Sequence, residues 1–250
     1  MESKIEYEIV LSDPPYEYDQ RCPHSKSRFG GGVSQQYHTQ DTNWIANLPV
    51  KDLAAKNSLL FQWTTCTHLP DALEIMKAWG FKFSTVAFCW VKNYPEQVMV
   101  SVIDPKTGKH LYYAYAVIVE PISVANLDWD QAIDERQPGI FLGTGYYSKS
   151  NVELVLLGRR GNSDRLKPVT DRVSNVFITP HPRANNKIIH SAKPVFVHRR
   201  INKMYPDLSK IELFARRRYH QGNWHFWGNQ VASDIALVDN QWRLINEDVA

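Results

Sequence analysis

The sequence predicts an α/β protein with a mostly parallel β-sheet and helices on both faces, organised as a single domain over residues 1–250. Apolar and β-branched runs, which are typical of buried strands, recur along the chain at 9–11, 58–65, 83–91 and 152–157. Residues 68–79 carry apolar side chains at helical spacing and are followed by Gly80, a common helix terminator. A strand, a helix and a strand in close succession are the pattern of a parallel sheet.

The composition is that of an ordinary globular protein. The chain has 250 residues, of which 43% are hydrophobic and 22% charged, and its net charge of +3 permits nucleic-acid binding without requiring it. No apolar run approaches the length of a membrane span, and the acidic start lacks the features of a targeting peptide. The three cysteines share no close spacing, which indicates reduced thiols and a cytoplasmic protein. Cys22 and His24 have no matching pair of ligands elsewhere, so we predict no metal site.

The strand at 9–11 ends in the motif Asp13-Pro14-Pro15-Tyr16. The prolines cannot continue a sheet ladder or a helix, so the chain leaves the strand in a stiff turn at the edge where open α/β sheets bind ligands. There the Asp13 carboxylate and the Pro14 carbonyl can accept the two N–H groups of an adenine N6 amine, while Tyr16 offers a flat face to the base. The motif is equally compatible with a surface turn in which Tyr16 packs on the prolines.

A polar, basic segment at 16–38 follows this turn. It contains Arg21, Lys26, Arg28 and the triplet Gly30-Gly31-Gly32. The glycines are not a phosphate-binding loop, because no Lys-Ser/Thr pair follows at the required spacing. We interpret the segment as a lid whose basic side chains contact substrate phosphates; a plain flexible loop is the alternative.

The middle of the chain interrupts the strand and helix pattern. After a short helix predicted at 48–54, strand-like runs at 98–103 and 111–119 flank a strong turn signal at 104–109. We therefore predict an insertion at 93–140 that contains a β-hairpin and then a short helix in an acidic segment.

The second half carries candidate cofactor contacts. We expect strands at 176–178, 210–216 and 235–238, a helix from 194 to about 203, and a C-terminal extension at 232–250. A strand that carries Glu212 and leads out through Arg216 suits a nucleoside cofactor, because an acid can bind ribose hydroxyls. Asn229 and Gln230 add paired donors and acceptors, and Lys193 adds a charge for the carboxylate of an amino-acid-bearing cofactor. Each residue alone suits an ordinary polar surface, and only the set favours a cofactor site.

An ordered series of short motifs carries a family resemblance over most of residues 7–231. Its members are Asp13-Pro14-Pro15-Tyr16, Tyr37-His38-Thr39, Leu48-Pro49-Val50, 60–65, 71–73, 79–81, 90–92, 143–146, 150–154, 190–194, 210–216 and 227–230. The chain resembles the MT-A70 family of adenine-N6 methyltransferases, which use S-adenosylmethionine. Any one motif is weak, but the series falls in the family's order.

The resemblance implies a Rossmann-like class I methyltransferase domain in a permuted order, with the catalytic motif ahead of the cofactor motif. By position, Asp13, Pro14, Pro15 and Tyr16 would hold the target adenine beside the methyl donor. Lys193 would meet the methionine carboxylate of the cofactor, and Glu212 with Asn229-Gln230 would meet its ribose and adenine. Phe214 and Arg216 look like further cofactor contacts, as does Asp13.

Family members that act on messenger RNA usually carry Trp where this chain has Tyr16, and Tyr is common in bacterial DNA adenine methyltransferases. The resemblance therefore favours DNA adenine-N6 methylation, of bacterial or phage type, over two alternatives: an RNA adenine-N6 methyltransferase and a catalytically silent nucleic-acid-binding partner. On duplex DNA the base would have to flip out of the stack to meet Tyr16. Basic residues are expected to hold the phosphates: Arg21, Lys26, Arg28, Arg159, Arg160, Arg217 and Arg218. Palindromic targets would favour a homodimer, with the inserted hairpin as a candidate interface.

Overall fold

The computed structural model describes residues 5–17, 39–93, 97–103, 106–107, 110–117, 148, 150–162, 166–184, 187–189, 191–219 and 221–245. The chain divides into two compact units. The first comprises Met1–Cys89, Glu153–Asn175 and Val195–Ala250, and the second comprises Trp90–Val152 and Val176–Pro194.

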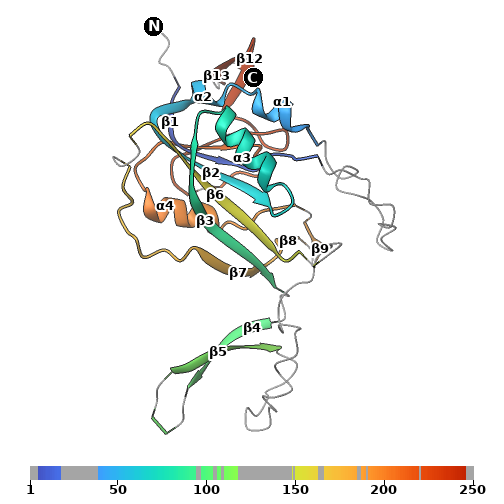
Figure 1. Ribbon diagram of the computed structural model, residues 1–250, viewed down its shortest axis with the longest axis vertical. Helices are drawn as coiled ribbons and strands as arrows, with labels where there is room; N and C mark the ends of the chain where they lie inside the picture. Colours follow the sequence, from blue (N-terminus) through green and yellow to red (C-terminus); the bar gives the residue numbers. More distant parts are fainter. Residues whose placement is uncertain are drawn as a thin grey trace, which may run out of the picture. The chain divides into compact units, whose positions relative to one another are not determined.

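A seven-stranded sheet has the strand order β11-β10-β1-β2-β6-β3-β7 (Figure 1). Its strands are β1 (Tyr7–Ser12), β2 (Ala54–Thr65), β3 (Lys82–Asn93), β6 (Val152–Arg160), β7 (Val176–Pro180), β10 (Lys210–Leu213) and β11 (Trp224–Trp227). Strand β1 pairs in parallel with β2 and β10, and β10 pairs in parallel with β11, whereas β6 runs antiparallel to β2. This mixed but mostly parallel sheet confirms the predicted fold class.

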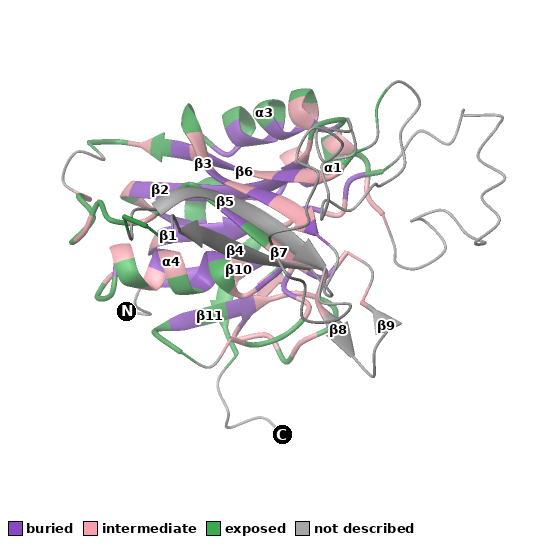
Figure 2. Ribbon diagram, turned by 90° about the horizontal axis from the view of Figure 1, so that it is seen from below, coloured by how far each residue is buried: buried purple, intermediate pink, exposed green. Residues whose placement is uncertain are grey.

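Helices of the first unit cover both faces of its strands. On one face lie α1 (Thr42–Ala46), α2 (Val50–Leu53) and α3 (Leu69–Ala78), and on the other lies α4 (Phe196–Met204) (Figures 1 and 2). Two neighbouring residues of β2 show this, because successive side chains of a strand point to opposite faces of the sheet. The side-chain amide of Gln62 donates to the carbonyl of Ala72 in α3, while the ring of Phe61 lies 6.4 Å from that of Tyr205 at the end of α4. The prediction of helices on both faces is confirmed.

The sequence explains why these elements form. Ile9, Val10 and Leu11 are fully buried, as a strand covered on both faces requires, and so β1 is a continuous apolar run. Helix α3 has a proline in its first turn and ends before Gly80, whose φ of +82° favours glycine.

Hairpins complete the described structure. In the second unit, β4 (Gln97–Ile103) and β5 (His110–Val117) pair antiparallel and confirm the inserted β-hairpin. The short helix expected after it, and residues 18–38 of the expected lid, lie outside the described residues. Two smaller hairpins were not predicted as such: β8 (Arg183–Ala184) with β9 (Lys187–Ile188), and β12 (Ile235–Val238) with β13 (Gln241–Leu244).

Candidate functional site

Three adjacent parallel strands bring the two predicted motifs to one edge of the sheet, which is the edge formed by the carboxyl ends of these strands. Ser12 at the end of β1 is in register with Leu213 of β10, which is in register with Trp227 of β11. The Asp13 amide donates to the Leu213 carbonyl at 3.4 Å. The predicted catalytic motif and the predicted cofactor motif therefore leave the sheet side by side, at the carboxyl ends where α/β proteins bind ligands.

The turn after β1 is a closed structure rather than an extended tail. The amide of Tyr16 donates to the Pro14 carbonyl at 2.9 Å, and the amide of Gln40 donates to the Pro15 carbonyl at 2.8 Å. A carbonyl oxygen has two lone pairs, so the Pro14 carbonyl keeps one for a further donor. Asp13 is half-buried, which leaves part of its side chain at the surface of the edge.

Tyr16 is held more firmly than the sequence predicted. Its hydroxyl donates to the Trp63 carbonyl at 3.0 Å and accepts from the Gln62 side-chain amide at 3.0 Å. Its ring stacks on that of His68, with the centroids 5.0 Å apart and the planes 11° apart. Only 6% of Tyr16 is exposed, so the open platform expected from the sequence is a buried ring with one face already covered. The cause is the direction of β2. It runs parallel to β1 and ends at the same edge of the sheet, so the turn after it brings His68 against Tyr16.

The predicted cofactor residues Glu212, Phe214, Arg216 and Gln230 lie around the neighbouring strand ends. Glu212 has its carboxylate 2.7 Å from the imidazole of His198, and Phe214 turns the chain out of β10 with a φ of +62°. The Phe214 ring packs against that of Trp227 at 5.4 Å. The guanidinium Nε of Arg216 donates to the Gln230 side-chain oxygen at 2.8 Å, so the turns after β10 and β11 are joined.

Gly228 allows the two turns to approach this closely. A Cβ at this position would overlap the carbonyl oxygen of Ala215 and would lie 2.7 Å from its amide nitrogen. The Ala215 amide donates to the Trp227 carbonyl at 2.9 Å, and the Gly228 amide donates to the Ser233 hydroxyl at 3.1 Å. Asn229 and Gln230 follow directly, which places their amide groups at the same edge.

The predicted basic residues are not all brought to this edge. Because β6 is antiparallel to β2, Arg160 is in register with Ser58, four residues or about 13 Å along the strand from Gln62. Its guanidinium donates to the carbonyls of Lys51 and Ala54, and Arg159 precedes it at the same end. Arg159 and Arg160 therefore lie at the opposite edge of the sheet from Asp13.

Two further basic residues follow β10. Arg218 forms a two-pronged ion pair with Asp234 at 2.8 and 3.0 Å and also donates to the Ala232 carbonyl. Arg217 is exposed beside it. Lys193 belongs to the second unit, where its ammonium lies 3.4 Å from the carbonyl of Ser191. Arg21, Lys26 and Arg28 lie outside the described residues.

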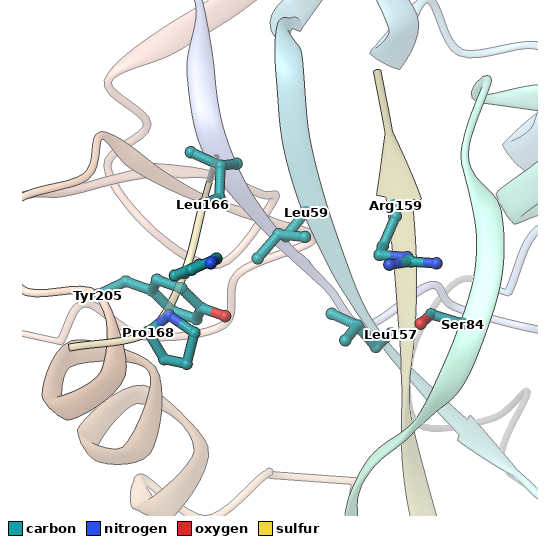
Figure 3. Close-up of a pocket in the computed structure, with 8 residues that line it drawn as sticks. Leu59, Ser84, Leu157, Arg159, Leu166, Pro168 and Tyr205 are labelled. Carbon is teal, nitrogen blue, oxygen red and sulfur yellow. The ribbon is translucent and has the colours of Figure 1, made fainter. Parts of the chain in front are cut away.

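A cavity of about 530 Å³ is lined by side chains that include Leu59, Arg159 and Tyr205 (Figure 3). Leu59 and Arg159, which pair in register, both line it, so it lies on the half of the sheet away from the Asp13 edge. Among the described residues, no cluster of three or more His, Cys, Asp or Glu side chains could hold a metal ion. No helix in the described part of the chain is long and apolar enough to cross a membrane.

The structure adds functional candidates that the sequence analysis missed. His68 was assigned only to a predicted helix, Asp71 to that helix and to the family motif at 71–73, and His198 only to another helix. Their signal in the sequence is weak: His68 and Asp71 are three residues apart at a helix start, where side chains of this spacing face one another. His198 has no local signal, because its partner Glu212 lies in another element.

Comparison with known proteins decides the family. The sequence model of MT-A70 matches residues 7–115 and 122–230. The chain belongs to the MT-A70 family. Methyltransferases of this family depend on S-adenosylmethionine, so the methyl donor of this MT-A70 protein is S-adenosylmethionine.

Relatives of this MT-A70 protein fall into two groups. The chain is 25% identical over 247 residues to the type II methyltransferase M.MunI of a Mycoplasma species, covering 94% of this chain and 82% of that protein. It is 24% identical over 236 residues to the Drosophila melanogaster N(6)-adenosine-methyltransferase MT-A70-like protein, of which it spans 28%. It is 23% identical over 236 residues to the human N(6)-adenosine-methyltransferase catalytic subunit METTL3, of which it spans 29%.

Proposed function

We propose that this protein transfers a methyl group from S-adenosylmethionine to the N6 amine of adenine in DNA. The observation that carries the proposal is the shared edge of β1, β10 and β11. There the Asp13-Pro14-Pro15-Tyr16 turn lies next to the turn after β10, which carries Phe214 and Arg216. The turn after β11, which carries Asn229 and Gln230, follows beside it. An acceptor-rich turn beside a polar nucleoside-type site suits transfer between an adenine and a nucleoside cofactor.

On the adenine side, the chain supplies hydrogen-bond acceptors that would orient the amine, and the proton that N6 loses when the N–CH3 bond forms would pass to the Asp13 carboxylate or to water. The Asp13 carboxylate and the remaining lone pair of the Pro14 carbonyl would each accept one N–H of the amine. This would hold the amine in a single orientation, so the nitrogen lone pair points away from both acceptors. Orientation of this kind lowers the entropic part of the barrier. Stacking of the base on Tyr16 would use ring surface other than the face that His68 covers.

On the cofactor side, the residues present fit S-adenosylmethionine. Glu212, Asn229 and Gln230 are suited to ribose hydroxyls and adenine edges, and Phe214 and Arg216 flank the same turns. The backbone of Gly228 approaches that of Ala215 so closely that a side chain would not fit, which fixes the two turns that carry these residues against each other. Lys193 is our proposed contact for the methionine carboxylate. When bound, the cofactor supplies the methyl group.

Two observations favour DNA. Tyr16 stands where RNA-directed members of the family usually carry Trp. The type II methyltransferase M.MunI is matched over 82% of its length, whereas each N(6)-adenosine-methyltransferase named above is matched over less than a third. Those relatives support RNA adenine as the second candidate substrate. Arg217, exposed after β10, is our proposed phosphate contact among the described residues, and a homodimer on palindromic DNA remains a hypothesis.

Transfer of a labelled methyl group from S-adenosylmethionine would test the proposal. The substrates are unmethylated duplex DNA, single-stranded DNA and RNA. Each is offered to the wild type, to Asp13→Ala and to the control Asp52→Ala, which changes an exposed acid on α2. We expect N6-methyladenine in DNA that is lost with Asp13→Ala and kept with Asp52→Ala. Label only in RNA would replace the substrate and keep the site. Tight cofactor binding with no label would indicate a silent binding partner.

A further inference from the structure

A second aromatic ring lies against the tyrosine of the catalytic motif. His68 comes from the turn between β2 and α3, and its imidazole is nearly parallel to the ring of Tyr16, 11° apart with centroids at 5.0 Å. His68 is buried, with 6% of its surface exposed. The turn after β2 therefore delivers a flat side chain to the adenine-binding motif of the neighbouring strand.

An acid in the first turn of α3 fixes the orientation of this imidazole. Nδ1 of His68 lies 2.9 Å from Oδ2 of Asp71. The other oxygen of Asp71 accepts from the hydroxyl of Thr42 at 3.2 Å. Both carboxylate oxygens are thus engaged, which limits rotation of Asp71 and, through it, of the His68 ring.

Together with contacts from α1 and β2, these contacts surround Tyr16. Thr42 begins α1, two residues after Gln40, and Gln40 donates to the Pro15 carbonyl immediately before Tyr16. The hydroxyl of Tyr16 is held from β2 by Gln62 and by the Trp63 carbonyl. The backbone, the hydroxyl and one ring face of Tyr16 are therefore each held by a different element.

We infer that His68, oriented by Asp71, is a positioning residue that sets the plane of the Tyr16 ring against which the target adenine is placed. The inference rests on the proposed function. Because His68 occupies one face of Tyr16, the base meets the remaining ring surface, and its plane follows the plane that His68 imposes. Among the described residues Asp71 contacts His68 and Thr42 and makes no direct contact with the Asp13-Pro14-Pro15-Tyr16 turn, and Asp71→Asn keeps the oxygen that accepts from Thr42. The effect of Asp71→Asn on Tyr16 should therefore pass through His68.

An ordinary packing role for His68 makes a different prediction. A residue that merely fills space would, when truncated, lower the stability of the protein and affect cofactor binding and catalysis together. A positioning residue changes kcat at saturating S-adenosylmethionine while the cofactor Kd stays the same. An aromatic ring without the hydrogen bond to Asp71 should recover most of the loss, because stacking is retained.

The experiment measures cofactor Kd, kcat and KM for unmethylated DNA with full-length protein. The variants are His68→Ala, His68→Phe, Asp71→Asn, the double variant His68→Ala with Asp71→Asn, and the control Glu74→Gln, an exposed acid on α3. We expect His68→Ala to lower kcat about threefold to tenfold, the range that loss of one aromatic pair implies. The cofactor Kd should stay within about twofold.

His68→Phe should recover most of the loss. Asp71→Asn should lower kcat in the wild-type background and add nothing to His68→Ala, because residues that act through one another are not additive.

Full kcat in His68→Ala, or an equal effect of Asp71→Asn in both backgrounds, would overturn the inference. If His68→Ala does not fold, as shown by lost cofactor binding, Asp71→Asn and His68→Phe decide: unchanged kcat in both overturns it. A wild-type protein that methylates no substrate overturns the proposed function instead, and this inference falls with it.

Discussion

Nε2 of His198 lies 2.7 Å from Oε2 of Glu212, which joins helix α4 to strand β10 beneath the proposed cofactor site. Both side chains are largely buried, at 11% and 13% exposed. The His198 ring also packs against the rings of Trp224 and Tyr219, each with its centroid 4.9 Å away. The carboxylate proposed to bind ribose is therefore held in place before any cofactor binds, which reduces the ordering cost of binding.

His198→Ala should weaken S-adenosylmethionine binding about tenfold, because Glu212 loses the group that orients it. The free energy of unfolding should fall by about 1–3 kcal/mol, the cost of leaving a buried charged group without its partner. Isothermal titration and urea denaturation measure the two effects. Lys203→Ala, an exposed position on the same helix, serves as the control. An unchanged cofactor Kd in a destabilised His198→Ala protein would show that the pair is only structural.

Gly228→Ala should damage the cofactor site directly. The added Cβ would overlap the carbonyl of Ala215, so the turns after β10 and β11 must separate. We expect a loss of about 1–3 kcal/mol in the free energy of unfolding and a cofactor affinity at least about tenfold lower. Denaturation and cofactor titration should be compared with Val231→Ala in the same turn. Wild-type affinity in Gly228→Ala would mean that the cofactor does not contact these turns.

Arg160 and Arg217 should separate structural from functional positive charge. Arg160 donates to two backbone carbonyls at the edge away from Asp13, so Arg160→Ala should lower stability by about 1–3 kcal/mol and leave DNA affinity unchanged. Arg217→Ala should weaken DNA binding similarly for all sequences and reduce the salt dependence by about one phosphate contact. Fluorescence anisotropy at several salt concentrations measures both. The reverse result, with Arg160 controlling DNA affinity, would move the nucleic-acid surface to the opposite edge of the sheet.

The sequence allowed the turn at Asp13-Pro14-Pro15-Tyr16 to be predicted because its signals are local. A strand followed by Asp13-Pro14-Pro15 can only leave the sheet there. The run at 210–216 was likewise predicted as a strand that carries Glu212, although in the structure this strand ends at Leu213. Strand direction is not a local property. The antiparallel course of β6 takes Arg159 and Arg160 away from the site, although in sequence they follow a strand just as Arg217 and Arg218 do.

Contacts between distant elements escaped prediction for the same reason. Strand β11 is only four residues long and was not predicted, because it is defined by its pairing with β10. The covering of Tyr16 by His68 depends on the adjacency of β1 and β2, which the local pattern does not specify. The positions of single motifs on their strands were thus predictable, whereas the partners that orient them were not.

Tyr7 should make the protein sensitive to alkaline pH. Burial, with a contribution from the Asp234 carboxylate, raises the pKa of Tyr7 well above its ordinary value. The phenol is 4% exposed and lies 2.5 Å from Nδ1 of His225. Above about pH 10 the unfolded chain releases this proton while the folded chain retains it, so the unfolded state binds fewer protons and stability falls as pH rises. Below about pH 10 the contribution is fully present.

We therefore expect the free energy of unfolding of the wild type to fall more steeply than that of Tyr7→Phe above about pH 10, by up to about 1.4 kcal/mol per pH unit. At neutral pH, Tyr7→Phe should cost only about 0.5–1.5 kcal/mol for the lost hydrogen bond. Burial also raises the pKa of Tyr205 and lowers that of Lys210, but both residues are present in both proteins, so their contributions cancel in the difference. Urea denaturation across about pH 8 to 11 gives the two curves. Curves that stay parallel throughout would mean that the Tyr7 phenol titrates alike in the folded and unfolded chains.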